Sequence, residues 1–164
     1  MHFKVLSSSG ITIDDMVKAM REVYAAANID VEVSSTEELN LPMLTDLYVN
    51  DCTRGRPTEE QKQLFSNRLN VGDHEIAVYL VRSLFPPENG CAVHPPGRPG
   101  VVIANTATIW TLGHEIGHVL GLDHVDNSDR LMKGKGTHGI TNPPPDLSPE
   151  EIEIMMSSPY ILSI

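Results

Sequence analysis

The chain has 164 residues and a mass of 18.0 kDa, the size of a single domain with one hydrophobic core. Hydrophobic residues make up 40% of it and charged residues 21%, which excludes a disordered, collagenous or coiled-coil protein. The 22 acidic residues outnumber the 12 Lys and Arg residues, and this formal net charge of −10 speaks against nucleic-acid binding.

No apolar stretch approaches the roughly 20 residues that a membrane span needs. The first residues, Met1 to Ser7, also lack the apolar segment of a signal peptide. The sequence therefore predicts a cytoplasmic protein, one that is exported by a non-classical route, or a processed piece of a longer chain.

The N-terminal part of the chain reads as strand, helix and strand. Residues 3–6 predict a short strand, and a helix capped by Thr12 follows, with apolar residues at helical spacing as far as Ala27. The alternating residues 29–33 predict a second strand. The stretch 34–50 fits either a strand or a helix.

The middle of the chain opens with a helix. Thr58 and Gln61 have the spacing of a capping box, and the apolar pattern after them predicts a helix that reaches Leu69. The nearly continuous apolar residues 75–81 predict a buried central strand. The segment 86–100 is rich in Pro and Gly, and it predicts a loop.

Within that loop, residues 91–93 predict a short edge strand, and residues 101–104 predict another buried strand. A helix is predicted over residues 106–120, with Ile109 in its apolar stripe. A further capping box at residues 148–151, with Pro in the first helical position, predicts a C-terminal helix.

The two cysteines, Cys52 and Cys91, are too few for a disulfide framework. A single bridge between them would require their Cα atoms to lie within about 7 Å. Two unpaired thiols are the favoured interpretation, and one disulfide is the alternative.

Residues 114–124, with the sequence HEIGHVLGLDH, predict a metal site. His114 and His118 are four residues apart, so a helix places both imidazoles on one face, where they can bind a common zinc ion. Glu115 is turned about 100° around the helix from His114. It can therefore act on a metal-activated water without ligating the metal.

Gly121 explains how a third ligand reaches the same metal. A glycine can adopt a positive φ at the end of a helix and turn the chain sharply, which brings His124 back toward the first two histidines. Three His ligands leave one coordination position open, as in catalytic rather than structural zinc sites.

At these residues the sequence resembles the metzincin clan of zinc endopeptidases, whose motif is H-E-x-x-H-x-x-G-x-x-H. Metzincins place a methionine in a tight turn beneath the metal. Met132 lies eight residues after His124, and this spacing is most similar to that of the matrixins. Gly134 stands where astacins and serralysins have a tyrosine, so no tyrosine ligand is expected.

The resemblance implies an α+β fold: a mixed, twisted sheet with an antiparallel edge strand, two major helices and a C-terminal helix. It implies one catalytic domain over residues 1–164. Residues 1–120 would form an upper subdomain with the sheet and the metal helix. Residues 121–164 would form a lower subdomain with the third ligand, the methionine turn and the last helix.

The resemblance also implies one catalytic Zn²⁺ and an extended protein or peptide substrate. Such a substrate would pair with the edge strand near Gly90, Cys91 and Ala92, beside a pocket wall that contains His138. Calcium is a further candidate cofactor, because four acidic and amide side chains cluster at the end of the motif and just after it. These side chains are expected to cap turns and face water instead: Asp123, Asp126, Asn127 and Asp129.

Two other functions remain open. The chain could be a zinc-binding interaction module that cleaves nothing, although such a module has no need of Glu115. It could also be a narrowly specific exported protease, a toxin or effector, held in check by an inhibitor or immunity partner. In each case the chain is expected to be a monomer.

Overall fold

The computed structural model describes all residues 1–164, and they form two compact units. The first unit consists of residues 1–10 and 32–107, and the second of residues 11–31 and 108–164. Helices α1 (Ile13–Tyr24) and α3 (Thr111–Val119) belong to the same unit as the C-terminal segment.

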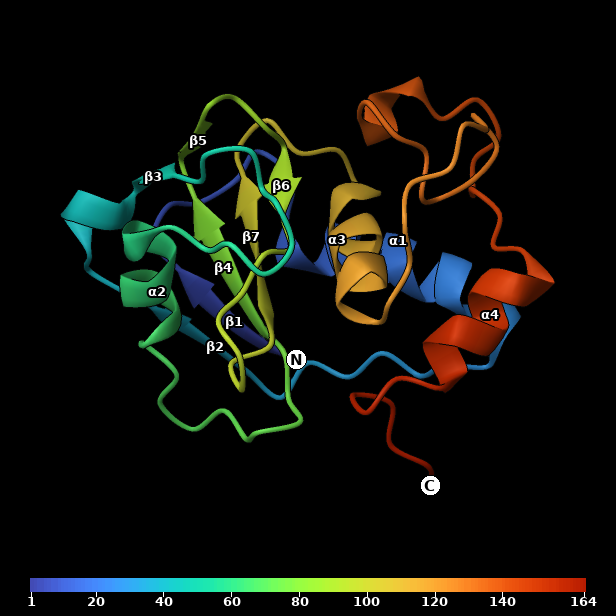
Figure 1. Ribbon diagram of the computed structural model, residues 1–164, viewed down its shortest axis with the longest axis horizontal. Coiled ribbons are helices and arrows are strands. Elements are labelled where there is room, and N and C mark those ends of the chain that lie inside the picture. Colours follow the sequence, from blue (N-terminus) through green and yellow to red (C-terminus); the bar gives the residue numbers. More distant parts are fainter. The chain divides into compact units, whose positions relative to one another are not determined.

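The first unit is built on a mixed five-stranded sheet with the order β2-β1-β4-β7-β6 (Figure 1). Four neighbouring strands are parallel, and only the edge strand β6 is antiparallel, so the expected mixed sheet is confirmed. All residues of β4 and β7 are buried, in agreement with their apolar sequences. The strands are β1 (His2–Val5), β2 (Ser35–Glu38), β4 (Ala77–Val81), β6 (Gly90–Cys91) and β7 (Gly100–Ala104).

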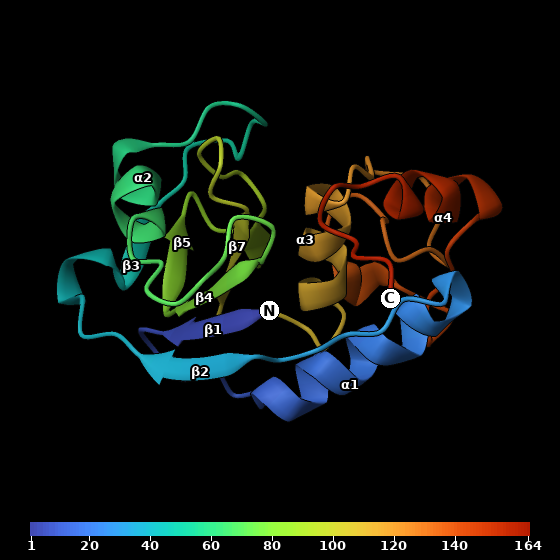
Figure 2. The ribbon, with the colours of Figure 1, turned by 90° about the horizontal axis from the view of Figure 1, so that it is seen from below.

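Helix α2 (Glu59–Phe65) covers one face of this sheet (Figures 1 and 2). The predicted capping box is present, because the Thr58 hydroxyl accepts from the Gln61 N–H and the Gln61 side chain accepts from the Thr58 N–H. The ring of Phe65 packs on Tyr79 of β4, with centroids 4.8 Å apart. The helix ends four residues before the predicted end at Leu69.

The ambiguous stretch 34–50 contains strand β2, a 3₁₀ turn η2 (Pro42–Leu44) and strand β3 (Asp46–Tyr48). Strand β3 pairs in parallel with β5 (Ser83–Phe85) in a separate two-stranded sheet. Its middle residue is buried and its outer residues are exposed, as expected for a strand with one face on the core.

The predicted strand over residues 29–33 is wrong. These residues alternate in burial as the pattern indicates, with Val31 buried and Asp30 and Glu32 exposed, but they pair with no strand. Strand β1 pairs instead with residues 35–38, in the register His2 to Ser35. Alternation reports which side chains are buried, whereas a ladder also requires a neighbouring backbone.

The favoured interpretation of two unpaired thiols is also wrong, because Cys52 and Cys91 form a disulfide. Their Cα atoms lie 5.9 Å apart, although 39 positions separate the two residues in the sequence. The bridge connects the turn after β3 with the edge strand β6. Only the tertiary fold brings these two segments together.

Replacing both Cys52 and Cys91 by Ser is expected to lower the free energy of unfolding by about 2–4 kcal/mol, because the bridge limits the freedom of the unfolded chain. Urea denaturation followed by circular dichroism measures this loss. A reductant should lower the stability of the wild type to that of the variant and leave the variant unchanged. If the reductant left the wild type unchanged, the bridge would not stabilise the fold.

The second unit is helical (Figure 2). Helix α1 begins as predicted, with the Thr12 side chain accepting from the Asp15 N–H, and it packs against α3. Its buried Tyr24 donates to the carbonyl of Gly113, 2.8 Å away, and burial raises the pKa of this phenol above its usual range. The elements are α1 (Ile13–Tyr24), η1 (Ala25–Ala27), α3 (Thr111–Val119), η3 (Thr137–Gly139) and α4 (Pro149–Met156).

Helix α3 begins at Thr111, five residues later than predicted, and Ile109 is 38% exposed rather than part of the core. The Thr111 hydroxyl accepts from the N–H of Thr108 across this turn, which gives the backbone an alternative to helical bonding. The predicted C-terminal helix is confirmed with its capping box at Ser148 and Glu151. None of the helices is both long enough and apolar enough to cross a membrane.

Candidate metal centre

Helix α3 carries the first two histidines and ends in a turn that redirects the chain. Gly121 has φ +108°, as the sequence predicted. The N–H of Leu122 donates to the Gly117 carbonyl at 2.9 Å, and the N–H of Gly121 donates to the His118 carbonyl at 3.1 Å. These two bonds define a Schellman motif, in which a glycine is favoured because a side chain strains a positive φ.

The redirected chain brings His124 to the two helical histidines. The Nε2 atom of His124 lies 3.1 Å from Nε2 of His118 and 3.2 Å from Nε2 of His114. The ligand atoms of all three lie within 4.8 Å of one another, and no other group of three His, Cys, Asp or Glu residues does so. The structure thus brings together the three residues that the sequence predicted as ligands.

Hydrogen bonds to the backbone determine the protonation of these rings. The Nδ1 atoms of His114 and His118 each lie 2.8 Å from a carbonyl oxygen, of Leu131 and Leu122 respectively. A carbonyl oxygen only accepts, so each Nδ1 donates a proton, and the Nε2 atom of the neutral ring keeps its lone pair. Two lone pairs therefore point at the Nε2 atom of His124.

This donor set fits a zinc ion. His124 can donate a hydrogen bond to only one of the two facing nitrogens, whereas a cation interacts favourably with all three lone pairs. Tetrahedral coordination with Zn–N bonds of about 2.0–2.1 Å separates neighbouring nitrogens by about 3.3 Å. The observed distances of 3.1 and 3.2 Å are close to that value.

The surroundings of His114 also favour its neutral form. Burial lowers the pKa of its imidazole to about 4, which outweighs the opposing effect of the hydrogen bond to Leu131. The neighbouring His118 and His124 lower it further. At neutral pH, His114 therefore has the unprotonated Nε2 that a metal ligand requires.

Glu115 lies in α3 directly after His114, and only 8% of it is exposed. Buried carboxylates are rare, and they normally have a structural partner or a function. The position of this carboxylate next to the first histidine is the one that the motif requires.

The segment after His124 doubles back so that residues 130–134 lie beside its start. The N–H of Val125 donates to the Met132 carbonyl at 2.9 Å, and the N–H of Gly134 donates to the Val125 carbonyl at 3.1 Å. The same segment supplies the Leu131 carbonyl that accepts from His114. The backbone around Met132 is therefore connected to both ends of the histidine motif.

Met132 is fully buried against helix α3. A Cβ atom built on Gly117 would lie only 2.7 Å from its sulfur. The close packing of Met132 on the helix therefore favours a glycine at residue 117, one position before His118.

Gly117→Ala is therefore expected to lower the free energy of unfolding by about 1–3 kcal/mol, because the added methyl group displaces the buried Met132. Gly113→Ala in the same helix is the matched control, since a Cβ there meets its neighbours at 3.6 Å or more. The control is expected to be neutral or to stabilise the helix by up to about 1 kcal/mol. Equal effects of the two changes in urea unfolding would contradict the close approach.

The expected substrate residues belong to both compact units. Gly90 and Cys91 form β6, which pairs only with β7, so an edge strand is present over residues 90–91 rather than over the predicted residues 91–93. The Cys91 side chain is 1% exposed and disulfide-bonded, and it offers no free thiol. His138 is exposed in η3, where its ring packs over Gly136.

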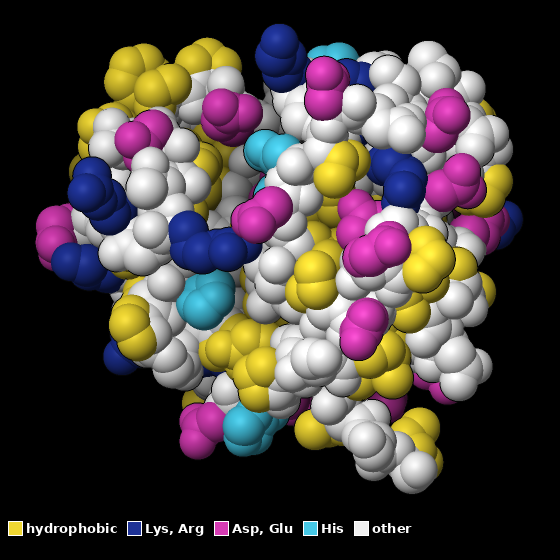
Figure 3. Space-filling model, turned by 45° about the vertical axis from the view of Figure 1, so that its right-hand side comes forward, with side chains coloured by type: hydrophobic (Ala, Val, Ile, Leu, Met, Phe, Trp, Pro, Cys, Tyr) yellow, Lys and Arg dark blue, Asp and Glu magenta, His cyan; other side chains and the backbone are white.

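The carboxylates of Asp123, Asp126 and Asp129 form no group of three that could hold a metal ion. Asn127 accepts from the N–H of Asp129 at 2.9 Å, which is the turn-capping role expected from the sequence. Asp and Glu side chains are scattered over the face shown in Figure 3 and form no single patch there.

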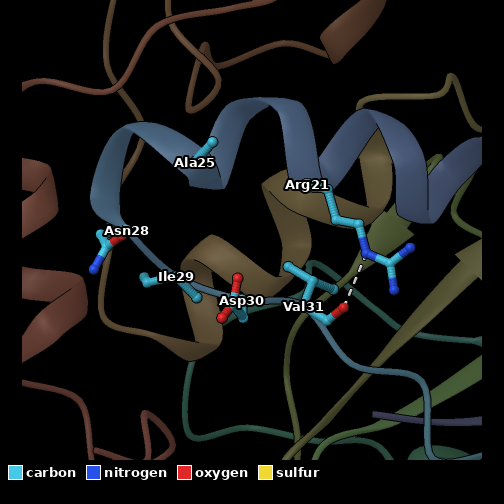
Figure 4. A pocket seen from close by; sticks show the side chains of 6 residues that line it. All are labelled: Arg21, Ala25, Asn28, Ile29, Asp30 and Val31. Atoms are coloured by element: carbon cyan, nitrogen blue, oxygen red, sulfur yellow. Dashed lines mark hydrogen bonds between the residues drawn. The ribbon is translucent and has the colours of Figure 1, made fainter. Parts of the chain in front are cut away.

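A cavity of about 450 Å³ lies at the end of α1 (Figure 4). Arg21 donates its Nε to the Val31 carbonyl at 3.0 Å across it. None of the predicted site residues lines this cavity, so it is distinct from the histidine cluster. Its lining residues are Arg21, Ala25, Asn28, Ile29, Asp30 and Val31.

Two features beside the histidine cluster were missed in the sequence. The Leu131 and Leu122 carbonyls that orient His114 and His118 leave no signal, because every residue has a carbonyl. Arg130 and Glu151 form an ion pair next to this segment. The sequence had indicated Glu151 only as part of a helix cap.

No protein-family model and no curated protein matches the chain. Solved structures do resemble it, and they are zinc metallopeptidases. Metalloproteinase-II from Bacteroides fragilis has a TM-score of 0.67 and 19% identity, over 99% of this chain and 53% of that one. The chain therefore spans about half the length of that protein.

The likeness extends to shorter proteins. Archaemetzincin from Methanopyrus kandleri has a TM-score of 0.61 and 16% identity, over 94% of this chain and 92% of that one. A zinc-dependent peptidase from Methanocorpusculum labreanum has a TM-score of 0.58 and 12% identity, over 94% and 98% of the two chains. These similarities establish the fold that the chain shares with zinc metallopeptidases.

Proposed function

We propose that the chain is a zinc-dependent endopeptidase of the metzincin type. The observation that carries this proposal is the convergence of three Nε2 atoms, two of them held as lone-pair donors by backbone carbonyls. Glu115 follows directly on the same helix. The expected position of Met132 after the third histidine and the fold of the structural neighbours support the same conclusion.

His114, His118 and His124 would hold one zinc ion. When bound, zinc supplies a Lewis acid that lowers the pKa of water and stabilises negative charge on a carbonyl oxygen. Glu115 accepts a proton from the water that attacks the peptide carbonyl. It then transfers this proton to the leaving amine, so that one carboxylate serves as base and as acid.

We infer that the substrate is an extended peptide that adds to the edge of the sheet at β6. Gly90 and Ala92 would contribute backbone groups to this pairing, which makes affinity largely independent of sequence. His138 is proposed to line a side-chain pocket. Its neighbour Thr137 is buried and lies within hydrogen-bonding distance of the Thr108 hydroxyl at 2.6 Å, which fastens η3 to the start of α3.

A proteome-wide cleavage profile tests this function. Cell-derived peptides and proteins are incubated with zinc-loaded wild type and with the Glu115→Gln variant, and new N-termini are identified by mass spectrometry. Many cleavage sites found only with the wild type are expected. Cleavage of one target alone would indicate a narrowly specific protease, and no cleavage by a zinc-containing wild type would indicate a binding module.

A further inference from the structure

We propose that Arg130 and Glu151 are positioning residues for the zinc centre, a role that rests on the proposed function. Neither residue belongs to the histidine motif. Together they hold the Leu131 carbonyl in the place where it accepts from Nδ1 of His114.

The ion pair joins α4 to the segment before Met132. Arg130 Nη1 donates to Glu151 Oε2 at 2.9 Å, with side-chain exposures of 28% and 10%. The same Glu151 oxygen accepts from the N–H of Ser148 at 2.6 Å. One carboxylate oxygen thus caps the helix and binds Arg130, while Oε1 is buried without a hydrogen-bond partner.

Backbone hydrogen bonds also connect residues 129–131 to Asp146, which precedes α4. The N–H of Leu131 donates to the Asp146 carbonyl at 3.1 Å, and the N–H of Asp146 donates to the Asp129 carbonyl at 2.7 Å. Arg130 stands in the sequence between Asp129 and Leu131, the two residues that make these bonds. Its side chain adds a third link, to Glu151 of α4. Leu131 is fully buried, and its carbonyl oxygen accepts a hydrogen bond from Nδ1 of His114 at 2.8 Å.

A partly buried, charge-assisted hydrogen bond restrains its partners more strongly than an exposed pair. Removing one member leaves the other charge poorly solvated, and the segment is expected to shift so that this charge reaches water. Such a shift moves the Leu131 carbonyl away from His114. Groups that orient metal ligands typically alter affinity by about 10–100-fold, and a pair one backbone step further away is expected to have a smaller effect.

Ser148→Ala separates this role from helix capping. The Ser148 hydroxyl accepts from the Glu151 N–H at 3.1 Å, so its loss weakens the helix cap by about 1 kcal/mol. The substitution leaves the ion pair intact, because the Glu151 carboxylate binds Arg130 and the backbone N–H of Ser148 and not the Ser148 hydroxyl. This variant is therefore a matched control for stability alone.

The experiment measures the rate of zinc transfer from the loaded protein to a chromogenic chelator, together with the visible spectrum of the cobalt-substituted protein. Arg130→Met and Glu151→Gln are each expected to release zinc about three- to tenfold faster than the wild type and to change the cobalt spectrum. The double variant should release zinc no faster than the quicker single variant, since both changes break one link. Arg130→Lys, which keeps the charge, should restore slower release.

Release from both single variants at the wild-type rate would overturn the proposal. It would also be overturned if Ser148→Ala, at an equal loss of thermal stability, released zinc equally fast. If Arg130→Met does not fold, the rate and cobalt spectrum of Arg130→Lys and Glu151→Gln still decide. A wild type that binds no zinc would instead refute the proposed function, and the positioning role with it.

Discussion

Glu115→Gln is expected to reduce peptide cleavage at least about 100-fold while the variant still binds one zinc ion. General acid–base groups contribute about 10²–10⁴-fold to turnover, and glutamine has the same shape but cannot accept the proton. Glu115 lies next to His114 on the helix but is not one of the three clustered histidines, so its replacement leaves all three imidazoles in place. Cleavage of a fluorogenic peptide and metal analysis of the purified protein measure the two quantities.

Glu153→Gln is the matched control for this change. Glu153 lies exposed on α4 in the same compact unit, and the substitution removes the same charge. It is expected to retain wild-type turnover. If Glu115→Gln kept more than a few per cent of the activity, Glu115 would not be the group that moves the proton.

His118→Ala is expected to weaken zinc binding more than 100-fold and to abolish cleavage. The change removes one of three converging nitrogens, a greater loss than that of a group that only orients a ligand. Titration of the metal-free protein against a competing chelator gives the affinity.

His74→Ala is the corresponding control. His74 is exposed in the first unit and lies outside the histidine cluster, so zinc binding should be unchanged. Equal losses of affinity in the two variants would show that zinc binds somewhere other than at the three histidines.

Features that depend on neighbours in the chain were predicted well. The caps at Thr12, Thr58 and Ser148 all form, because each side chain bonds to an N–H only three residues away. The buried strands β4 and β7 were predicted for a similar reason, since a strand covered on both faces is apolar throughout.

Features that depend on distant segments were not. Residues 29–33 have the alternation of a strand, yet β1 pairs with residues 35–38. Cys52 and Cys91 gave no sign of their proximity in the sequence, because they are 39 positions apart and the fold of the chain between them decides it. Helix α3 begins later than the apolar pattern predicted, because the Thr111 hydroxyl accepts a hydrogen bond from the N–H of Thr108.

The sequence by itself determined which residues form the candidate metal centre. His114 and His118 share a helix face, Gly121 takes the positive φ that the turn requires, and His124 follows at the spacing that completes the set. This was possible because helix geometry and glycine stereochemistry act over a few residues.

Only the tertiary structure decided how these residues are held. The Leu131 and Leu122 carbonyls determine which ring nitrogen of His114 and of His118 carries the proton. Met132 fills the space beside Gly117, and the Arg130 side chain joins the chain before Met132 to α4. Backbone carbonyls are chemically identical at every position, and packing partners come from distant parts of the chain. Their contribution therefore appears only once the chain is folded.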